Sequence, residues 1–327
     1  MDLSIIIVNY NVYNDVIECI TSINNNVSKL SYEIIVVDNN SSNRDIENLN
    51  KIFPQVKLIL NRDNKGFGYA NNIGAANAAG DYIVLVNPDI FFPDNSLEKM
   101  YEFIVSDHRI GVVGPVQVKP NSGIEYYYTF FPSIYSRLMQ EFRLYMTAPV
   151  MKQRFYNFLD NNIKLAKPFQ VDWVMGSCMM LKRKLFDEAG RFDEAFFLYE
   201  EETELEFRIK SAGYRNYMIP EAKVLHNHHS SSGKLGVLFV NYQEFRSRII
   251  FDCKRFKGIT YLFRRISISA ALITRIIYFS IKSIFNKRSK NKLLANYDLF
   301  LFSIKNKSDI SNDRYNFDKK LHLFIQQ

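Results

Sequence analysis

Four unbroken apolar runs in the first 90 residues constrain the fold most strongly. They are Leu3–Asn9, Glu33–Val37, Val56–Leu60 and Tyr82–Val86. Their Val, Ile and Leu residues are consecutive instead of alternating with polar ones, so we expect strands buried on both faces. Helical spacing at Val12–Ile23 and a small-residue segment at Tyr69–Ala79 separate them. This order predicts an α/β fold with a mostly parallel sheet flanked by helices.

The sequence after residue 120 predicts an insertion and further elements of the main domain, and then a second, smaller region. An aromatic and basic insertion covers about Glu125 to Lys167, and the apolar element Val171–Leu181 is broken by Gly176-Ser177. We predict a helix at Leu198–Ala212, ended by Gly213, and a strand at Tyr217–Leu225. The domain boundary is expected near Ser232, with a main domain at 1–232 and a helical region at 233–327.

The net charge of +8 is concentrated in one segment. Residues 254–292 hold eleven Lys or Arg and no Asp or Glu, which leaves 31 basic against 34 acidic residues elsewhere. A basic surface for nucleic acid is therefore not expected. Three distant cysteines suggest no disulfide framework, and the first residues lack a signal-peptide pattern, so we expect a cytoplasmic protein.

Asn87-Pro88-Asp89 follows directly on the apolar run Tyr82–Val86. A carboxylate at the C-terminal end of a buried strand lies at the edge where open α/β sheets bind ligands. Asp89 offers hard oxygen ligands of the kind that Mg²⁺ or Mn²⁺ prefers beside phosphate. The alternative is an ordinary turn, since Asx-Pro-Asp is common turn chemistry.

Two further polar segments follow strands. Asp38 ends the second run and is expected to bind a base or a ribose, or else to form a cap or an Asx turn. Gly66 and Gly68 precede the small-residue helix, whose N-terminus could approach a diphosphate. The next glycine is Gly74, so the spacing is not the GxGxxG of a dinucleotide fold.

An acidic cluster opens the helix predicted near residue 200. Glu202, Leu205 and Ile209 share one face by spacing, and we expect that face to pack inward, with Glu201 and Glu204 pointing away from it. A carboxylate at the inner edge of a cleft is placed to act as a general base. The alternative is a solvated acidic first turn, which the helix dipole would stabilise.

His226-Asn227-His228-His229 forms the last cluster. No cysteine or acidic residue stands near it at a zinc-motif spacing. We expect one histidine to complete an oxygen-rich metal site, and solvated loop histidines are the alternative.

Together these segments resemble the signature of family-2 glycosyltransferases with the GT-A fold, and most closely their bacterial rhamnosyltransferase-like branch. The resemblance covers about residues 3–232. It includes Asn64 to Asn72, Gly80-Asp81-Tyr82, Asn87-Pro88-Asp89, Trp173 to Ser177, Phe192 to Glu202, Ala212-Gly213-Tyr214 and His226 with Ser230-Ser231. The implied fold is that of nucleotide-diphospho-sugar transferases, with a C-terminal basic amphipathic helical extension.

The resemblance also implies roles for individual residues. Glu202 would be the catalytic base, with Glu201 as fallback, and Asp89 and His226 would hold a metal. Nucleotide-sugar contacts are implied at Asn9, Tyr10, Asp38, Lys65, Gly66, Asn72, Asn87 and Asp89, and acceptor contacts at Trp173 and Gly176. Two positions depart from the family pattern: Asn87 replaces the first carboxylate of its DxD motif, and Glu202 stands where aspartate is usual.

The implied activity is that of an inverting hexosyltransferase that uses Mg²⁺ or Mn²⁺. Its donor would be dTDP-rhamnose or a UDP-sugar, and its acceptor a saccharide or lipid-linked saccharide of a bacterial surface polysaccharide such as an O-antigen or a capsule. The alternative is a non-catalytic, membrane-associated saccharide- or nucleotide-binding protein on the same fold. A nicotinamide-dependent oxidoreductase is a third possibility, but the sequence lacks its glycine fingerprint.

The basic segment at 254–292 is interpreted as a membrane-binding region. Its longest uncharged run, Ile266–Thr274, is shorter than the about 20 residues needed to span a bilayer. Arg264, Arg275 and Lys282 fall within about 20° of one another on a helical wheel, whereas most apolar residues lie elsewhere. We expect a basic amphipathic helix on the anionic inner face of the plasma membrane. The alternatives are packing on the main domain and homo-oligomerisation.

Overall fold

The structure is a computed structural model, and it describes residues 1–119, 123–125, 127, 129–142, 149–227, 236–286 and 288–315. The chain divides into two compact units. The first unit contains 1–131, 150–193 and 202–234, and the second contains 132–149, 194–201 and 235–327. The boundary predicted at Ser232 lies outside the described residues, as do His228 and His229.

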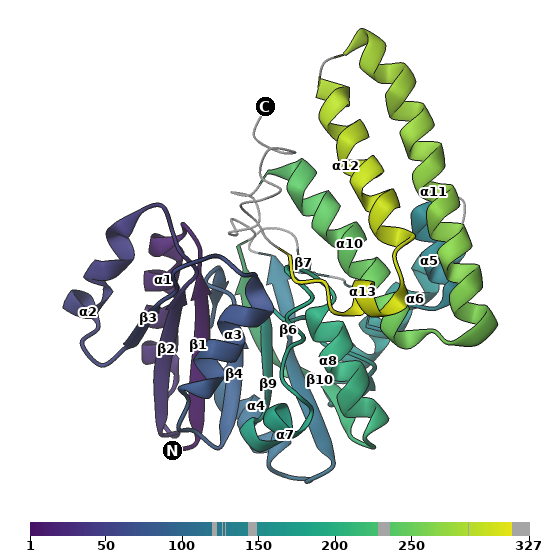
Figure 1. Ribbon diagram of the computed structural model, residues 1–327. Helices are drawn as coiled ribbons and strands as arrows, with labels where there is room; N and C mark the ends of the chain where they lie inside the picture. The colour runs from purple at the N-terminus through teal and green to yellow at the C-terminus, as the bar shows by residue number, and fades with distance from the viewer. Residues whose placement is uncertain are drawn as a thin grey trace. The chain divides into compact units, whose positions relative to one another are not determined.

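The first unit is built from strands and helices that largely alternate along the chain (Figure 1). Its strands are β1 (Leu3–Asn9), β2 (Tyr32–Asp38), β3 (Lys57–Leu60), β4 (Tyr82–Val86), β5 (Ile90–Phe91), β6 (Ile110–Lys119), β7 (Gly123–Ile124), β8 (Phe169–Val171), β9 (Cys178–Lys182) and β10 (Arg215–His226). Its helices are α1 (Tyr13–Asn26), η1 (Arg44–Asn48), α2 (Leu49–Ile52), α3 (Phe67–Ala76), α4 (Ser96–Ile104), α6 (Pro149–Lys164), α7 (Arg183–Glu188) and α8 (Glu201–Ser211).

Within the described residues these strands form one mixed sheet, in the order β3-β2-β1-β4-β9-β6-β10-β5. The neighbours β3, β2, β1 and β4 are parallel, which confirms the parallel arrangement predicted for the first four apolar runs. Beyond them the sheet is mixed, because β9 lies antiparallel between β4 and β6, whereas β6 and β10 are again parallel. The expectation of a mostly parallel sheet therefore applies to the N-terminal half.

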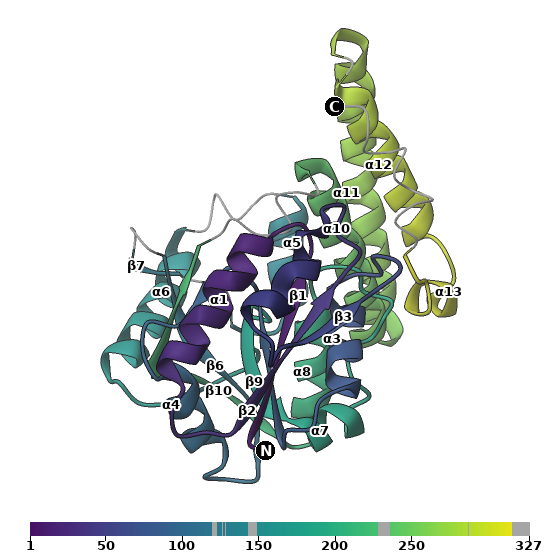
Figure 2. The ribbon, with the colours of Figure 1, turned by 90° about the vertical axis from the view of Figure 1, so that its left-hand side faces the viewer.

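Both faces of this sheet are covered, which explains the unbroken apolar runs. Leu3, Ile5 and Ile7 of β1 pack in the cluster that contains the apolar faces of α1 and α4. Ile6 points to the opposite face and packs with residues of α3, α6, α7 and α8. Figure 2 shows α1 and α4 together on one side of the sheet. Successive side chains of β1 thus enter two different halves of the core.

The helix predicted from Leu198 begins later, at Glu201. The preceding residues Tyr199 and Glu200 have φ angles of 69° and 65°, and this left-handed conformation cannot continue a right-handed helix. The apolar element predicted at Val171–Leu181 is likewise divided into β8 and β9, with Gly176-Ser177 between them.

The second unit consists of helices and the segment 194–201. The helices are α5 (Ile134–Glu141), α10 (Val237–Arg255), α11 (Gly258–Phe285), α12 (Arg288–Ser303) and α13 (Lys307–Ser311). Long antiparallel α11 and α12 pack against each other as a hairpin. Among the described residues, α11 is the one helix long and apolar enough to cross a membrane by length and composition. This helix is longer than the uncharged run Ile266–Thr274, because its arginines and lysines do not end it.

The helical wheel predicts that Arg264 of α11 belongs to an exposed basic face. In the structure it does not. It is buried and binds Glu141 of α5 with two N–H···O bonds, at 2.5 and 3.0 Å. Its Nε donates to Asp252 at 3.1 Å, and Asp252 also accepts from Arg137. Arg137 in turn holds Glu200 through two bonds, at 2.7 and 2.8 Å. This buried ion-pair network joins α5, α10, α11 and the segment before α8.

Candidate active site

The first element of the site is a polar cradle at the C-terminal ends of β1 and β2. Asn9 and Asp38 are register partners, and Asn9 Nδ2 donates to Asp38 Oδ1 at 2.6 Å. Ser41 donates to both carboxylate oxygens, through its hydroxyl at 2.6 Å and its N–H at 2.9 Å. Asp38 therefore bonds its own following backbone, as considered from the sequence, but at three residues on and so not as an Asx turn. Its bonds also fix the carboxylate at the sheet edge where ligands bind in this class of fold.

The loop before α3 lies beside this cradle. Asn39 follows Asp38, and its side-chain nitrogen donates to Asn64 Oδ1 and to the carbonyl oxygen of Gly66. Gly66 has φ of 99°, a conformation that favours glycine, and no side chain caps the N-terminus of α3. Lys65 is exposed, with Nζ 4.9 Å from the Tyr69 ring centroid. The backbone N–H groups at the N-terminus of α3 and the ammonium group of Lys65 are suited to an anionic ligand.

Asn72 has a structural role that the sequence did not indicate. Its Nδ2 donates to the carbonyl oxygen of Phe192 at 2.9 Å, and its Oδ1 accepts from the N–H of Phe192 at 3.0 Å. Because both amide atoms are engaged and the side chain is buried, we leave Asn72 out of the proposed donor contacts. Tyr10, which follows β1, is partly exposed.

The Asn87-Pro88-Asp89 turn places a carboxylate beside His226 at the end of β10. Asp89 is buried, and among the described residues neither of its side-chain oxygens accepts a hydrogen bond. His226 Nε2 lies 3.5 Å from Asp89 Oδ1, and His226 Nδ1 lies 3.0 Å from Glu125 Oε2. The N–H of Asn227 donates to the carbonyl oxygen of Asp89, which fixes the two segments together.

These residues fit a divalent cation. Burying a carboxylate is costly, and the 3.5 Å contact to His226 Nε2 is long, so a cation bound at Asp89 would lower that cost further. A histidine whose second nitrogen meets a carboxylate is the usual arrangement of a metal-binding histidine, so Glu125 would orient His226. In the described part of the chain no three His, Cys, Asp or Glu side chains gather as a metal cage. Asp89 and His226 would leave positions for phosphate and water, as Mg²⁺ sites commonly do.

The charge state of His226 follows from the same contacts. Burial lowers its pKa, but Asp89 and Glu125 outweigh burial and raise the pKa to about 9. Without a cation, His226 is therefore protonated at neutral pH and supplies the positive charge beside Asp89. Binding of a metal by this nitrogen would release that proton.

Glu202 meets the turn that contains Gly176. A Cβ built on Gly176 would lie 3.3 Å from Glu202 Cβ and 3.5 Å from its carboxyl carbon. The next residue, Ser177, accepts at its carbonyl oxygen from the N–H of Asn87 at 2.8 Å. The structure thus connects Glu202, through Gly176-Ser177, to the turn that holds Asp89. These candidates, distant in sequence, belong to one edge of the sheet.

The other glutamates of α8 differ from our expectation. Glu201 and Glu204, expected to point away from the inward face, are both buried, whereas Glu202 is only partly buried. Glu204 pairs with Arg208, whose guanidinium also donates to the carbonyl oxygen of Arg191. Glu206 was not singled out from the sequence, although its i+4 spacing from Glu202 places both on one face. It is fully buried, and its two carboxyl oxygens accept from the N–H of Val174 at 3.1 Å.

Trp173 is positioned by its neighbours and is not buried in the core. Its Nε1 donates to the carbonyl oxygen of Phe130 at 3.2 Å, and its ring lies 5.7 Å from that of Tyr127. Because Glu206 holds the next residue, Val174, one side chain fixes the segment between Trp173 and Gly176. The indole is partly exposed, so part of its surface can contact a ligand.

Glu206→Gln should show the effect of burying this carboxyl group. Burial raises the pKa of Glu206 well above 4.5, the Val174 N–H opposes the shift, and the Glu202 charge adds to it. The folded protein therefore keeps a proton that the unfolded chain releases, and wild-type stability falls as pH rises above 4.5. Between the pKa of Glu206 in the unfolded chain, 4.5, and its raised pKa in the folded protein, the free energy of unfolding of the glutamine variant should rise relative to wild type by about 1.4 kcal/mol per pH unit.

Urea denaturation of both proteins at pH 5 and pH 8 measures this gain. Glu102→Gln, at an exposed position, is the matched control and should differ from wild type equally at both pH values. An equal difference for Glu206→Gln at both pH values would show that Glu206 is ionised in the folded protein.

Comparison with known proteins identifies the family. Residues 4–190, more than half of the chain, match the family model for glycosyl transferase family 2. The chain belongs to glycosyl transferase family 2. It is therefore a glycosyltransferase with the GT-A-like fold, as the motif resemblance predicted.

A curated relative of this family 2 glycosyltransferase comes from Mycobacterium tuberculosis. It is an N-acetylglucosaminyl-diphospho-decaprenol L-rhamnosyltransferase, 26% identical over 213 residues that cover 62% of this chain and 68% of the relative. This similarity supports the rhamnosyltransferase-like assignment.

Solved structures share the fold at low identity. The structure of GalNAc-T7 with UDP, GalNAc and Mn²⁺ matches with a TM-score of 0.55 and 19% identity, over 78% of this chain. The present chain spans about half of that protein, 51%. The mannosyltransferase PcManGT from Pyrobaculum calidifontis, solved with GDP-Man and Mn²⁺, matches with a TM-score of 0.54 and 15% identity, over 95% of this chain and 86% of that one.

Proposed function

We propose that this family 2 glycosyltransferase is an inverting, metal-dependent enzyme that transfers a sugar from a nucleoside-diphosphate donor to a saccharide or lipid-linked saccharide. The observation that carries the proposal is the buried carboxylate of Asp89, which accepts no hydrogen bond among the described residues and lies beside His226. Rhamnose from dTDP-rhamnose is our first choice of donor, because the relative from M. tuberculosis is named a rhamnosyltransferase.

On the donor side, the proposal assigns a role to each residue of the site. Asp38, held by Asn9 and Ser41, binds the nucleoside, while Lys65 and the N–H groups after Gly66 attract the diphosphate. Asp89 and His226 hold Mg²⁺ or Mn²⁺, which when bound neutralises charge on the diphosphate.

The acceptor side is built around Glu202. Its carboxylate removes the proton from the acceptor hydroxyl as that oxygen bonds to the anomeric carbon of the sugar and the bond from this carbon to the nucleoside diphosphate breaks, which releases the nucleoside diphosphate. Gly176 leaves room beside it, because a side chain at this position would lie close against Glu202 Cβ, at 3.3 Å. Trp173 supplies an apolar face for the acceptor ring. Asn87, as a neutral side chain next to the metal ligand, contributes a hydrogen bond and no charge.

We further propose a cytoplasmic protein bound peripherally to the inner face of a bacterial plasma membrane, in the synthesis of a surface polysaccharide. The exposed apolar side chains of α11 support this location, among them Ile277, Ile281 and Ile284. Arg275 and Lys282 lie within the apolar part of the helix, and these cations make a transbilayer position costly.

Asp89→Asn tests the metal site. The amide removes the anionic ligand with little change in shape, so we expect Mn²⁺ affinity to fall by at least about tenfold and sugar transfer to fall with it. Free Mn²⁺ measured by electron paramagnetic resonance, with and without dTDP, reports the affinity. Asp81→Asn, at an exposed position before β4, is the matched control and should behave as wild type. Unchanged Mn²⁺ affinity in Asp89→Asn would remove Asp89 from the metal site.

A further inference from the structure

Residues 173–177, which border the proposed acceptor site, are named the acceptor segment. They lie between β8 and β9 and belong to neither strand, so the hydrogen-bond ladder of the sheet does not fix them. Side chains of other elements hold the centre of the segment instead. The carboxyl group of Glu206 accepts from the N–H of Val174, with both oxygens at 3.1 Å. The hydroxyl oxygen of Tyr127 accepts from the N–H of Met175 at 3.5 Å, so Glu206 makes the closer contact.

Helix α8 contains both Glu206 and the proposed base, Glu202. The two residues are four apart, so they lie one turn from each other on the same face of the helix. The acceptor segment meets this face at two places. Gly176 lies against Glu202, where an added Cβ would be 3.3 Å from Glu202 Cβ, and Val174 is bound by Glu206. Trp173 and Gly176, the two residues proposed to contact the acceptor, therefore lie on either side of the residue that Glu206 holds.

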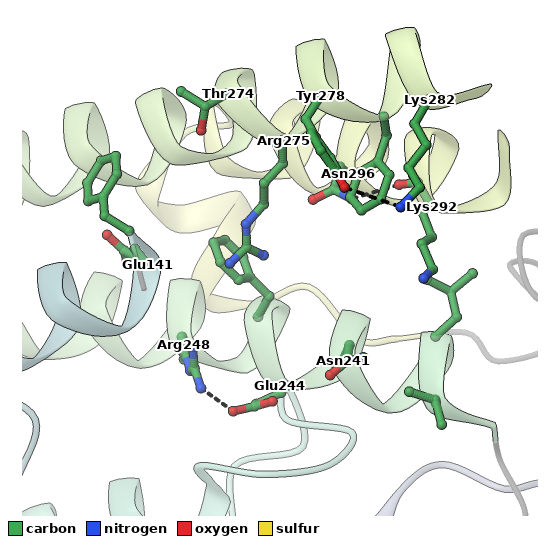
Figure 3. Close-up of a pocket in the computed structure, with 15 residues that line it drawn as sticks. Glu141, Asn241, Glu244, Arg248, Thr274, Arg275, Tyr278, Lys282, Lys292 and Asn296 are labelled. Carbon is green, nitrogen blue, oxygen red and sulfur yellow. Dashed lines mark hydrogen bonds and ion pairs between the residues drawn. The ribbon is translucent and has the colours of Figure 1, made fainter. Parts of the chain in front are cut away.

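Glu206 has no cation beside it, and this determines its charge. In the second unit Glu244 pairs with Arg248, as Figure 3 shows, and Glu141 binds Arg264. In the described part of the chain no Lys, Arg or His pairs with Glu206 in this way. A fully buried carboxyl group without a cation is more stable in its uncharged form.

The groups that face Glu206 also favour the uncharged form. Burial raises its pKa well above 4.5, the N–H of Val174 opposes the shift, and the charge of Glu202 on the same helix adds to it. Tyr127 faces it from the aromatic insertion and is uncharged at neutral pH, because burial raises the pKa of its hydroxyl group. Glutamine therefore resembles the native acid in size, in charge and in its carbonyl oxygen.

We propose that Glu206 is a positioning residue for the acceptor: it holds the acceptor segment on α8, so that Trp173 and Gly176 form a binding surface beside Glu202. The proposal deepens the proposed function and rests on it, because the acceptor roles of Trp173 and Gly176 belong to that function. Nucleotide and metal binding are assigned to other elements. Loss of Glu206 should therefore weaken acceptor binding and leave nucleotide and Mn²⁺ binding unchanged.

Fluorescence of Trp173, the only tryptophan in the sequence, reports the position of the segment. Glu206→Met keeps a similar volume but leaves the buried N–H of Val174 without an acceptor. The indole should then be quenched by acrylamide at least about twofold more strongly than in wild type, because the segment opens locally. Glu206→Gln still accepts from this N–H and should be quenched as wild type at neutral pH. If Glu206→Met does not fold, Glu206→Asp, which keeps the acid on a shorter side chain, should show the same increase.

Glu98→Met is the matched control for a purely structural loss. Glu98 is also buried and accepts from two backbone N–H groups, those of Ser28 and Lys29, each at 2.8 Å. It belongs to α4, which packs on the opposite face of the sheet from α8. This variant should lose stability in urea denaturation, with quenching of Trp173 as in wild type.

Transfer kinetics give the second measurement, with dTDP-rhamnose as donor and octyl N-acetylglucosaminide as a soluble acceptor probe. Glu206→Met should raise KM for the acceptor at least about fivefold, the effect of one lost buried hydrogen bond, and Glu206→Gln should restore it. The affinities for Mn²⁺ and dTDP should stay as in wild type.

Three results would overturn the role of Glu206. They are unchanged quenching in Glu206→Met, an equal increase in Glu98→Met, and a loss of dTDP affinity as large as the loss of acceptor binding. The quenching result decides whether Glu206 holds the segment even if wild type does not use this acceptor probe, because it needs no substrate. A wild type that binds neither dTDP nor UDP would overturn the proposed function, and with it the acceptor role, whatever the quenching shows.

Discussion

Glu202→Gln is expected to lower kcat for sugar transfer by about 10²–10⁴-fold, the usual contribution of a general base. The substitution keeps the size of the side chain beside Gly176 but removes the group that takes the acceptor proton. Binding of the donor and of Mn²⁺ should remain as in wild type, because neither involves this carboxylate in the proposed mechanism. Initial rates with Mn²⁺ and a nucleotide-sugar, together with calorimetric titration of the nucleotide, measure the two effects.

Glu201→Gln is the decisive comparison, because Glu201 is the neighbouring candidate and receives the same chemical change. A large loss of kcat in Glu201→Gln, with normal rates in Glu202→Gln, would identify Glu201 as the base. Normal rates in both variants would show that neither carboxylate is the general base. Normal donor binding together with no transfer even in wild type would favour the non-catalytic saccharide-binding alternative.

Arg264→Met should destabilise the second unit by about 3–5 kcal/mol, the effect of removing one partner of a buried ion pair. The methionine fills similar volume, but it leaves the buried carboxylates of Glu141 and Asp252 without their shared cation. Arg264→Lys should lose less, since it keeps the charge but not the paired hydrogen bonds. Urea denaturation followed by circular dichroism measures the free energy of unfolding.

Arg265→Met is the matched control for this loss. Arg265 is the next residue of α11, is only partly buried, and donates to the carbonyl oxygen of Lys305 at the surface. Its replacement should change stability by less than about 1 kcal/mol, as is usual for exposed polar contacts. Similar losses in the two variants would mean that the buried network contributes no more than surface packing.

Local sequence patterns predicted the strands of the first unit well. Continuous Val and Ile in β1 and β4 mark strands covered on both faces, and the structure has β1 at Leu3–Asn9 and β4 at Tyr82–Val86, as predicted. The antiparallel insertion of β9 was not predictable from its own residues, because an apolar pattern contains no strand direction. α8 begins later than predicted because Tyr199 and Glu200 are left-handed. Neither is a glycine, the residue that usually indicates this conformation in a sequence.

Contacts between distant segments account for the remaining differences. Glu125 lies in an aromatic insertion with no motif, and only the fold brings it to His226. Arg264 has the same helical phase as Arg275, but its burial depends on Glu141, which is more than a hundred residues away. Glu206 is the exception, because its spacing from Glu202 was available in the sequence and would have identified it.

The two left-handed residues before α8 connect, along the chain, the buried ion-pair network to Glu202, the carboxylate that we propose as the base. Single residues in this conformation cost roughly 1–2 kcal/mol, and in this chain the two are adjacent. Arg137 holds Glu200 in the second unit, and Glu202, two residues later, belongs to the first. When Arg137 releases Glu200, the strain at Tyr199 and Glu200 can relax, and the start of α8 then loses its anchor. Mild denaturant should therefore abolish turnover before the sheet unfolds.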